Sequence, residues 1–451
     1  MNRFQIQEAI TKLGIIQLNE MQQKSMAVFA DGSDIILLSP TGTGKTLAYL
    51  LPVMSEINID DERVQAVVIV PSRELALQID NVIRQMKSGI RSVSCYGGRP
   101  AMEEHRTLTG VKPHIVIATP GRLVDHLEKR NIEPDAINTV VLDEFDKCLE
   151  FGFLDEMRHA IGLMPLIKRR ILLSATDSDK IPSFVGVDTD KKRNGKAIKT
   201  VRMDYLDLRE QVSSRISTNI VHSPVKDKLE TLLCLLRVFR QQRTIVFLNY
   251  REAVERTYQF LKEHGVSCEM FHGAMDQEHR EKSIYKFGNG TSNVLVSTDL
   301  SARGLDIPEI DNIVHYHLPL NEDAYIHRNG RTARWQSEGH AYIILHEDEV
   351  VPEYMDKNTP EFHIPRNLPD IMKSEWGTIY IGKGKRDKLS KMDVLGFVCK
   401  VGGLTRDDVG RIDVKEHQCF VAVKRNVLSA SIDLMKGQKI KGIKTLFVEA
   451  K

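Results

Sequence analysis

The sequence has no hydrophobic run that approaches the roughly 20 consecutive apolar residues of a membrane span, so we expect no membrane partner. No long apolar stretch follows Met1-Asn2-Arg3-Phe4, and we therefore expect no signal peptide. The six cysteines form no C-x-x-C pair. This argues against a zinc site and a disulfide framework, and it favours reduced, mostly buried thiols in a cytoplasmic protein.

Charge is nearly balanced overall, at +2, but it is unevenly distributed along the chain. From Ser374 to the end there are 16 Lys and Arg against 9 Asp and Glu, whereas the rest of the chain has 47 against 52. A basic unit on a slightly acidic body suggests an appended nucleic-acid-binding module, although a solvated charged surface would give the same count. The length of 451 residues predicts about three domains.

One stretch carries the strongest chemical signal. The segment Ser39-Pro40-Thr41-Gly42-Thr43-Gly44-Lys45-Thr46 follows an apolar, strand-like run and precedes residues with helical spacing. Glycines at 42 and 44 let backbone N–H groups approach phosphate oxygens, and the following helix points its positive end at them. Lys45 would contact the β- and γ-phosphates, and the Thr46 hydroxyl would bind Mg²⁺. The alternative is an ordinary glycine-rich turn, because Ser39 stands where the pattern has glycine.

The surrounding residues alternate short β-branched runs with helical segments, which predicts a parallel sheet covered by helices on both faces. We expect strands at 66–70, 114–118, 139–143 and 171–174. Ligands bind at the carboxyl ends of such strands. There, Asp143 is a candidate Mg²⁺ ligand, and Glu144 could orient or deprotonate an attacking water. Ser174 and Thr176 follow the last of these strands.

Together these segments resemble the DEAD-box RNA helicases. Pro71-Ser72-Arg73-Glu74-Leu75-Ala76, Gly97-Gly98 and Thr119-Pro120-Gly121-Arg122 match three further motifs of that family in order and spacing. The resemblance implies RNA contacts from Pro71, Arg73, Gly98, Thr119, Gly121 and Arg122, and coupling of hydrolysis to RNA through Asp146, Ser174 and Thr176. The signature tetrapeptide here is DEFD, with Phe145 in place of the family's Ala, and we expect Phe145 to repack beneath the motif with activity retained.

The family's adenine-reading segment is irregular in this chain. Gln22 is kept, but Leu18 replaces Pro and Asn19 replaces Thr. The resemblance implies that Asn19 and Gln22 contact the nucleotide. Phe4, the upstream aromatic, is as compatible with a core position as with stacking on the base.

A second α/β run follows a loosened stretch from Asp177 to about Pro224, with a hinge expected near Ser213 to Pro224. It has no glycine-bearing phosphate loop, as in the family's architecture of two RecA-like domains that share one ATP. Gln277 to Arg280 resembles an element that contacts RNA phosphate, through Gln277 and Arg280. Thr298 to Asp306 resembles another, in which Thr298 contacts RNA and Asp306 lies near the ribose.

Three arginines follow in Tyr325-Ile326-His327-Arg328-Asn329-Gly330-Arg331-Thr332-Ala333-Arg334. A guanidinium near the γ-phosphate neutralises charge in the transition state. By resemblance, Arg331 and Arg334 are catalytic fingers delivered from the second domain, together with Lys45 and Glu144 of the first, and Arg328 bridges the domains.

After Pro369 the pattern changes to a β-α-β-β-α-β order, the plan of RRM-like domains. This part resembles the C-terminal domain of DbpA-type helicases, which implies recognition of ribosomal RNA. The candidate RNA contacts are Lys383, Lys385, Arg386, Lys388, Lys439 and Lys441, and a solvated basic face is the alternative. Tyr380 and Phe420 could stack on bases, but core packing is favoured.

The sequence therefore predicts an α/β protein: two RecA-like parallel-sheet domains, 1–212 and 213–368, and a small α+β RRM-like domain, 374–451. The predicted function is an ATP- and Mg²⁺-dependent RNA helicase that closes on single-stranded RNA and unwinds short duplexes, in assembly of the large ribosomal subunit. We expect a cytoplasmic monomer. Two alternatives are an ATP-gated RNA clamp with little hydrolysis and a DNA-translocating motor.

Overall fold

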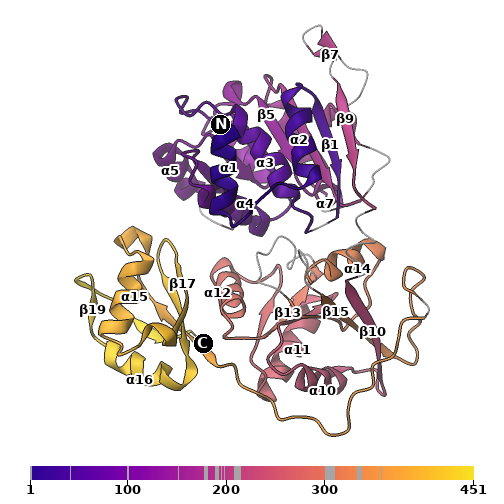
Figure 1. Ribbon diagram of the computed structural model, residues 1–451, viewed down its shortest axis with the longest axis vertical. Coiled ribbons are helices and arrows are strands. Elements are labelled where there is room, and N and C mark those ends of the chain that lie inside the picture. The colour runs from indigo at the N-terminus through magenta and orange to yellow at the C-terminus, as the bar shows by residue number, and fades with distance from the viewer. Residues whose placement is uncertain are drawn as a thin grey trace. The chain divides into compact units, whose positions relative to one another are not determined.

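The computed structural model describes residues 3–40, 42–98, 101–150, 152–176, 181–187, 192–193, 196–197, 199–207, 215–299, 310–332, 338–356 and 358–450 (Figure 1). Met1–Ser214 form one compact unit, and most of the chain from Arg215 to Lys451 forms a second. Among the described helices, none combines the length and the apolar character needed to cross a bilayer.

The first unit is built on a seven-stranded sheet of order β3-β4-β2-β5-β6-β1-β9, in which every pairing is parallel. Its strands are β1 (Asp34–Leu38), β2 (Ala66–Ile69), β3 (Ser92–Cys95), β4 (Ile115–Ala118), β5 (Thr139–Leu142), β6 (Arg169–Ser174) and β9 (Thr200–Asp204). Its helices are α1 (Arg3–Lys12), α2 (Glu20–Ala30), α3 (Lys45–Glu56), α4 (Arg73–Met86), α5 (Ala101–Val111), α6 (Pro120–Glu128), α7 (Phe145–Glu150) and α8 (Leu154–Gly162). The four predicted strands are confirmed to within about two residues.

Two apolar layers enclose this sheet because strand side chains alternate between its faces. Ile35 and Leu37 of β1 enter the layer formed with α1 to α4, whereas Ile36 and Leu38 enter the layer formed with α6 to α8. All five residues of β1 are buried. The strand that leads into the phosphate loop is therefore fixed from both sides.

The second unit contains a six-stranded parallel sheet of order β10-β15-β14-β11-β13-β12. Its strands are β10 (Ile216–Ser223), β11 (Thr244–Leu248), β12 (Cys268–Phe271), β13 (Val294–Thr298), β14 (Asn312–His315) and β15 (Gly339–His346). Its helices include α10 (Leu229–Phe239), α11 (Arg251–Glu263), α12 (Gln277–Gly288) and α14 (Glu322–Asn329).

The loosened stretch before this sheet holds more structure than the sequence predicts. The expected hinge near Ser213 to Pro224 is wrong for residues 216–223, because these form β10, paired with β15 along its whole length. Likewise, β9 lies in a stretch that shows no strand pattern. Both are edge strands with mixed burial, so neither has the continuous apolar run of a central parallel strand.

The same unit ends in a four-stranded antiparallel sheet of order β17-β18-β16-β21. Its elements are β16 (Trp376–Ile381), α15 (Lys391–Lys400), β17 (Val409–Val414), β18 (Cys419–Lys424), α16 (Arg425–Met435) and β21 (Phe447–Glu449), with a short hairpin of β19 (Lys439–Ile440) and β20 (Ile443–Lys444). Residues of both helices share one apolar core with the sheet. The predicted order β-α-β-β-α-β is confirmed.

Phe145 opens α7, and it is 1% exposed within the apolar layer that also contains Leu123, Cys148 and Met157. The prediction that it repacks beneath the acidic motif is confirmed. Here an aromatic ring does the packing, so the alanine usual at this position would leave a cavity.

We predict that Phe145→Ala destabilises the first unit by about 3–5 kcal/mol, since deleting a buried ring loses its transfer free energy and leaves a cavity. Thermal unfolding followed by circular dichroism would measure the drop in transition temperature. Met102→Ala is the matched control, because Met102 is 61% exposed and its truncation should lower the stability little. Equal transition temperatures for both variants would contradict the packing role of Phe145.

Candidate active site

The phosphate loop connects β1 to α3 at the carboxyl end of an inner strand. Gly42 and Gly44 have φ angles of 83° and 92°, a backbone conformation that side chains with a Cβ disfavour. Lys45 opens the helix, and its Nζ donates to the Ser39 carbonyl at 2.8 Å. Pro40, Thr43 and Thr46 lie in the same loop and first helical turn, and Thr41 lies outside the described residues. The loop thus has the conformation that its glycines predict.

The predicted adenine-reading segment contacts this loop directly. Asn19 caps α2: its side chain accepts from the Gln22 N–H at 2.9 Å, and the Gln22 side chain accepts from the Asn19 N–H at 3.0 Å. The remaining amide groups reach the phosphate loop, with Asn19 Nδ2 donating to the Thr43 carbonyl at 3.0 Å and Gln22 Nε2 to the Gly44 carbonyl at 3.2 Å. Asn is as good a helix cap as Thr, so the replacement at 19 preserves this geometry.

Two buried carboxylates follow β5. Asp143 and Glu144 are 4% and 9% exposed, and Asp143 Oδ1 accepts from the Glu144 N–H at 2.9 Å. Burial, and next the neighbouring Glu144, raise the pKa of Asp143 to about 6, even though Lys45 and a hydrogen bond from Tyr49 oppose the change. The site therefore holds excess negative charge beside the phosphate loop.

The donor set fits a magnesium ion. Asp143 and the Thr46 hydroxyl supply hard oxygen ligands of the kind that Mg²⁺ prefers. Glu144 Oε2 is buried and makes no hydrogen bond to the described residues, so one carboxylate oxygen remains available to a water or substrate. Glu144 also has a φ of 49°, unusual for a residue with a side chain and common at functional sites.

The predicted coupling residues of the first unit do meet. Thr176 Oγ1 donates to Asp146 Oδ2 at 3.2 Å, which connects the segment after β6 with the acidic motif after β5. Ser174 Oγ accepts from the Thr176 N–H at 3.2 Å and fixes the turn between them. This contact joins the two segments, and coupling of hydrolysis to RNA through these residues stays a prediction.

The candidate RNA residues of the first unit follow three neighbouring strands, β2, β3 and β4, at one edge of the sheet. Arg73 opens α4, and its Nη1 lies so close to Gly98 that a Cβ there would be 2.9 Å away. Thr119 is the N-cap of α6, whose first turn contains Gly121 and Arg122. Pro71, Arg73, Gly98, Thr119, Gly121 and Arg122 therefore lie at a common edge, and RNA contact by them stays a prediction.

Sequence reasoning missed the acid that holds Arg122. Glu104 of α5 is 4% exposed, and its Oε2 lies 3.2 Å from Arg122 Nε and 2.9 Å from His126 Nε2. Its other oxygen accepts from the Tyr96 N–H at 3.0 Å. No local pattern marks Glu104, because it is one of two adjacent glutamates in the first turn of α5.

The candidate RNA-binding residues of the second unit lie on α12 and at the end of β13. Gln277 and Arg280 lie in the first turn of α12, and Arg280 is 5% exposed with its guanidinium 4.8 Å from the centre of the Phe271 ring. Thr298 ends β13 and is buried. Their roles toward RNA stay predictions.

Arg328 is a charged side chain that is almost completely buried, at 1% exposed. Its guanidinium donates to Asp299 Oδ2 at 2.7 Å, to Asn249 Oδ1 at 2.6 Å and to the His317 carbonyl at 2.6 Å. All these partners belong to the second unit, so Arg328 ties three of its segments together. Bridging between domains by Arg328 stays a prediction, and Asp299 and Asn249 are partners that the sequence reasoning did not identify.

Arg331 lies two residues beyond α14 and is buried, and its role as a catalytic finger stays a prediction. Arg334 and Asp306, the other predicted nucleotide contacts of this unit, lie outside the described residues.

The candidate RNA-binding residues of the C-terminal domain lie in two segments: the turn after β16 that holds residues 383–388, and the β19–β20 hairpin that holds Lys439 and Lys441. We call these two segments the basic loops. Lys385, Arg386 and Lys439 are exposed and form no ion pair with the described residues. Lys383 pairs with Asp387 at 3.0 Å and Lys441 with Asp393 at 2.9 Å, so these two are partly neutralised. Phe420 is 1% exposed, and its ring lies 5.1 Å from Tyr285 of α12 and 5.7 Å from the half-buried Tyr380. Phe420 is therefore buried against α12 and is not part of the apolar core that the sheet shares with α15 and α16.

Three family models match successive parts of the chain: DEAD/DEAH box helicase at residues 19–183, Helicase conserved C-terminal domain at 227–336, and DbpA RNA binding domain at 378–448. The ATP-dependent RNA helicase DbpA of Escherichia coli is 31% identical over 442 residues, covering 96% of this chain and 94% of that protein. Its namesake from Bacillus subtilis is 26% identical over 97% of this chain and 95% of that protein.

Solved structures give the same result. The DEAD-box helicase Mss116 bound to single-stranded RNA and UDP-BeF matches with a TM-score of 0.68 and 28% identity, over 77% of this chain and 74% of that one. Dbp5 of Saccharomyces cerevisiae, bound to RNA and ADP-BeF₃, matches with a TM-score of 0.66 and 25% identity, over 76% of this chain and 87% of that one. Since the domain models, the full-length relatives and the phosphate-loop geometry agree, the chain belongs to the DEAD-box ATP-dependent RNA helicases and, within them, to the DbpA-like group.

Proposed function

We propose that this protein is an RNA-stimulated ATP hydrolase that closes on single-stranded RNA and locally unwinds short RNA duplexes. The observation that carries the proposal is the cluster at the carboxyl ends of β1 and β5. There Lys45, Thr46, Asp143 and Glu144 lie beside a loop to which Asn19 and Gln22 are hydrogen-bonded.

Each residue of the cluster has a role in this proposal. Asn19 and Gln22 hold the adenine edge, and the N–H groups of the loop and Lys45 bind the phosphates. Asp143 and Thr46 would hold Mg²⁺, which when bound would supply positive charge to neutralise the phosphates. Glu144 orients the attacking water and accepts its proton, using the buried oxygen that has no hydrogen bond to the described residues.

The second domain completes the site in the proposed closed state. Arg331 and Arg334 would stabilise charge on the transferring phosphoryl group, and Asp306 would contact the ribose. RNA bound by both domains favours closure, so RNA and ATP should bind cooperatively. Because the bound single strand would be bent, it could no longer pair with its complementary strand. Asp146, Ser174 and Thr176 would relay the presence of RNA to the acidic motif through the contact described above.

Recognition of ribosomal RNA in the assembling large subunit is part of the proposal, as are a monomeric state and a cytoplasmic location. The matching DbpA RNA binding domain model and the exposed basic loops support RNA targeting. Phe145 is buried in the core, and Asp146 keeps its hydrogen bond with Thr176, so the replacement of Ala by Phe145 gives no reason to expect loss of hydrolysis. The alternative function is an ATP-gated RNA clamp with little hydrolysis.

We predict that RNA raises the rate of phosphate release at least about tenfold and that DNA of the same sequence does not. Steady-state phosphate release with no nucleic acid, with a panel of RNAs that includes large-subunit ribosomal RNA fragments, and with DNA measures this directly. A rate that RNA leaves unchanged would support the clamp, and equal stimulation by DNA would support a DNA motor.

We predict that Arg331→Ala lowers the turnover number by about 10³–10⁵ and leaves ATP affinity nearly intact, since a finger acts on transition-state charge. Phosphate release at saturating RNA and equilibrium titration with a fluorescent ATP analogue separate the two quantities. Arg366→Ala, which removes an exposed arginine of the same unit, is the control and should change neither. Equal losses of binding and turnover would argue against a finger.

We predict that Lys385→Gln/Lys439→Gln raises the RNA concentration needed for half-maximal ATPase activation several-fold and reduces the salt dependence of RNA binding, because two phosphate contacts are lost. The maximal rate should be retained. Lys400→Gln/Arg406→Gln removes the same charge from another exposed part of the domain and should have a smaller effect. If the two double variants behave alike, the basic loops do not target RNA.

A further inference from the structure

The two parallel sheets share one strand order. If the strands of each are counted along the chain, the first sheet reads third, fourth, second, fifth, sixth, first, followed by its extra edge strand β9. The second sheet, read from β12 to β10, gives the same order. Therefore β10 and α10 of the second sheet correspond to β1 and α3 of the first. Lys228, the N-cap of α10, takes a place close to that of Lys45, the first residue of α3.

The second loop is not built to hold a phosphate. The segment from Ser223 to Lys228 contains no glycine, whereas the first loop has two glycines at positive φ. Lys228 is 3% exposed, and its ammonium donates to the Ile344 carbonyl at 2.7 Å and to the Tyr316 carbonyl at 3.2 Å. It also forms an ion pair with Glu349. The chain's own carboxylate thus occupies the anion position beside this lysine.

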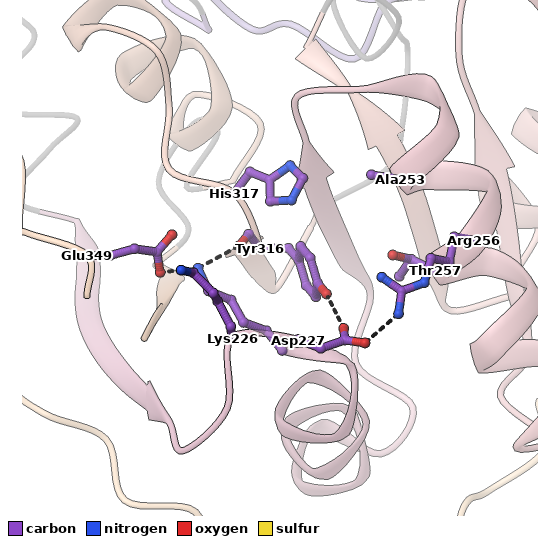
Figure 2. A pocket seen from close by; sticks show the side chains of 9 residues that line it. Lys226, Asp227, Ala253, Arg256, Thr257, Tyr316, His317 and Glu349 are labelled. Carbon is purple, nitrogen blue, oxygen red and sulfur yellow. Dashed lines mark hydrogen bonds and ion pairs between the residues drawn. The ribbon is translucent and has the colours of Figure 1, made fainter. Parts of the chain in front are cut away.

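A cavity of about 210 Å³ lies around this pair, with Tyr316, His317 and Glu349 at its lining (Figure 2). The charged side chains that line it are paired: Lys228 with Glu349, Asp227 with Arg256, and Lys226 with Asp348. This internal neutralisation does not favour an anionic ligand, and it points instead to a structural use of the lysine.

That use is visible in the loop that connects β14 to α14. Four successive backbone carbonyls of this loop, those of residues 316–319, each accept a hydrogen bond from a side chain of another segment. Lys228 donates to the first at 3.2 Å, Arg328 to the second at 2.6 Å, Asn249 to the third at 3.1 Å and Tyr354 to the fourth at 2.7 Å. We call these four side chains the loop clamp.

The clamped loop determines where α14 begins. Its last residue, Asn321, caps the helix by accepting from the Ala324 N–H at 2.8 Å. The helix carries Arg328 back into the clamp, and Arg331 follows within one turn of its end. A shift of the loop would therefore shift Arg331.

We propose that Lys228, with Glu349 as its built-in anion, is a positioning residue that holds the β14–α14 loop so that Arg331 is presented for catalysis. This rests on the proposed function, in which Arg331 acts on the phosphoryl group. The second sheet thus uses its counterpart of the phosphate-loop lysine to place a catalytic side chain.

The test is Lys228→Met/Glu349→Gln in the full chain, which removes both charges with little change of volume. We expect the turnover number at saturating ATP and RNA to fall about tenfold or more, because small misplacements of a catalytic group are costly. Affinity for ATP and RNA should change less than about twofold. Lys226→Met/Asp348→Asn removes an exposed ion pair at the same cavity and should leave all three quantities unchanged.

Tyr354→Phe is the second variant. It removes a single hydroxyl of the loop clamp, so it should fold even if Lys228→Met/Glu349→Gln does not. It should lower turnover about twofold to fivefold with unchanged affinities. Folded variants with unchanged turnover, or with equal losses in turnover and ATP affinity, would overturn the positioning role. If Arg331→Ala itself kept full turnover, Arg331 would not be a catalytic finger, and the proposed function would fail at this point together with the positioning role of the clamp. Low turnover of Arg331→Ala with normal turnover of the clamp variants would overturn the clamp alone.

Discussion

Parallel strands end at the same edge of a sheet, and the organisation of this protein depends on that constraint. In the first unit, the phosphate loop, the acidic motif and the segment of Ser174 and Thr176 follow β1, β5 and β6. Segments separated by up to about 130 residues in the sequence thereby lie on neighbouring strands. The contact between Thr176 and Asp146 is a direct consequence.

The candidate active site and the loop clamp treat charge in opposite ways. At the candidate active site, Asp143 and Glu144 are buried side by side, and the pKa of Asp143 rises to about 6 because burial and the neighbouring carboxylate disfavour its charge. Such a site is electrostatically incomplete until a cation neutralises it. In the second unit, Arg328 and Lys228 are buried with their counter-charges, Asp299 and Glu349, already in place. The first arrangement favours ligand binding and the second favours rigidity.

Rigidity in the second unit is useful to the proposed chemistry. A guanidinium stabilises a transition state only if its position is fixed before the reaction, since reorganisation would consume the stabilisation. The side chains that hold the β14–α14 loop come from four separate segments of the chain. Loops that follow parallel strands are otherwise among the more mobile parts of such folds.

The sequence by itself determined the fold class, the three-part order of sheets and the identity of the motif residues, because strand periodicity and motif spacing are local properties. It also determined that Phe145 would lie beneath the acidic motif, since an aromatic residue after a buried strand packs into the core. It did not reveal β9 and β10, whose edge positions give them no continuous apolar pattern.

Only the tertiary structure shows which side chains hold the buried arginines and lysine in place. Glu104, Asn249, Asp299 and Glu349 have no sequence signature, yet they hold Arg122, Arg328 and Lys228 in place. It also decided that Lys228 corresponds to Lys45, because the two loops share almost no sequence and are related through strand order. The physical reason is that ion pairs and carbonyl contacts form between residues far apart in the chain, and distance along a sequence does not encode proximity in space.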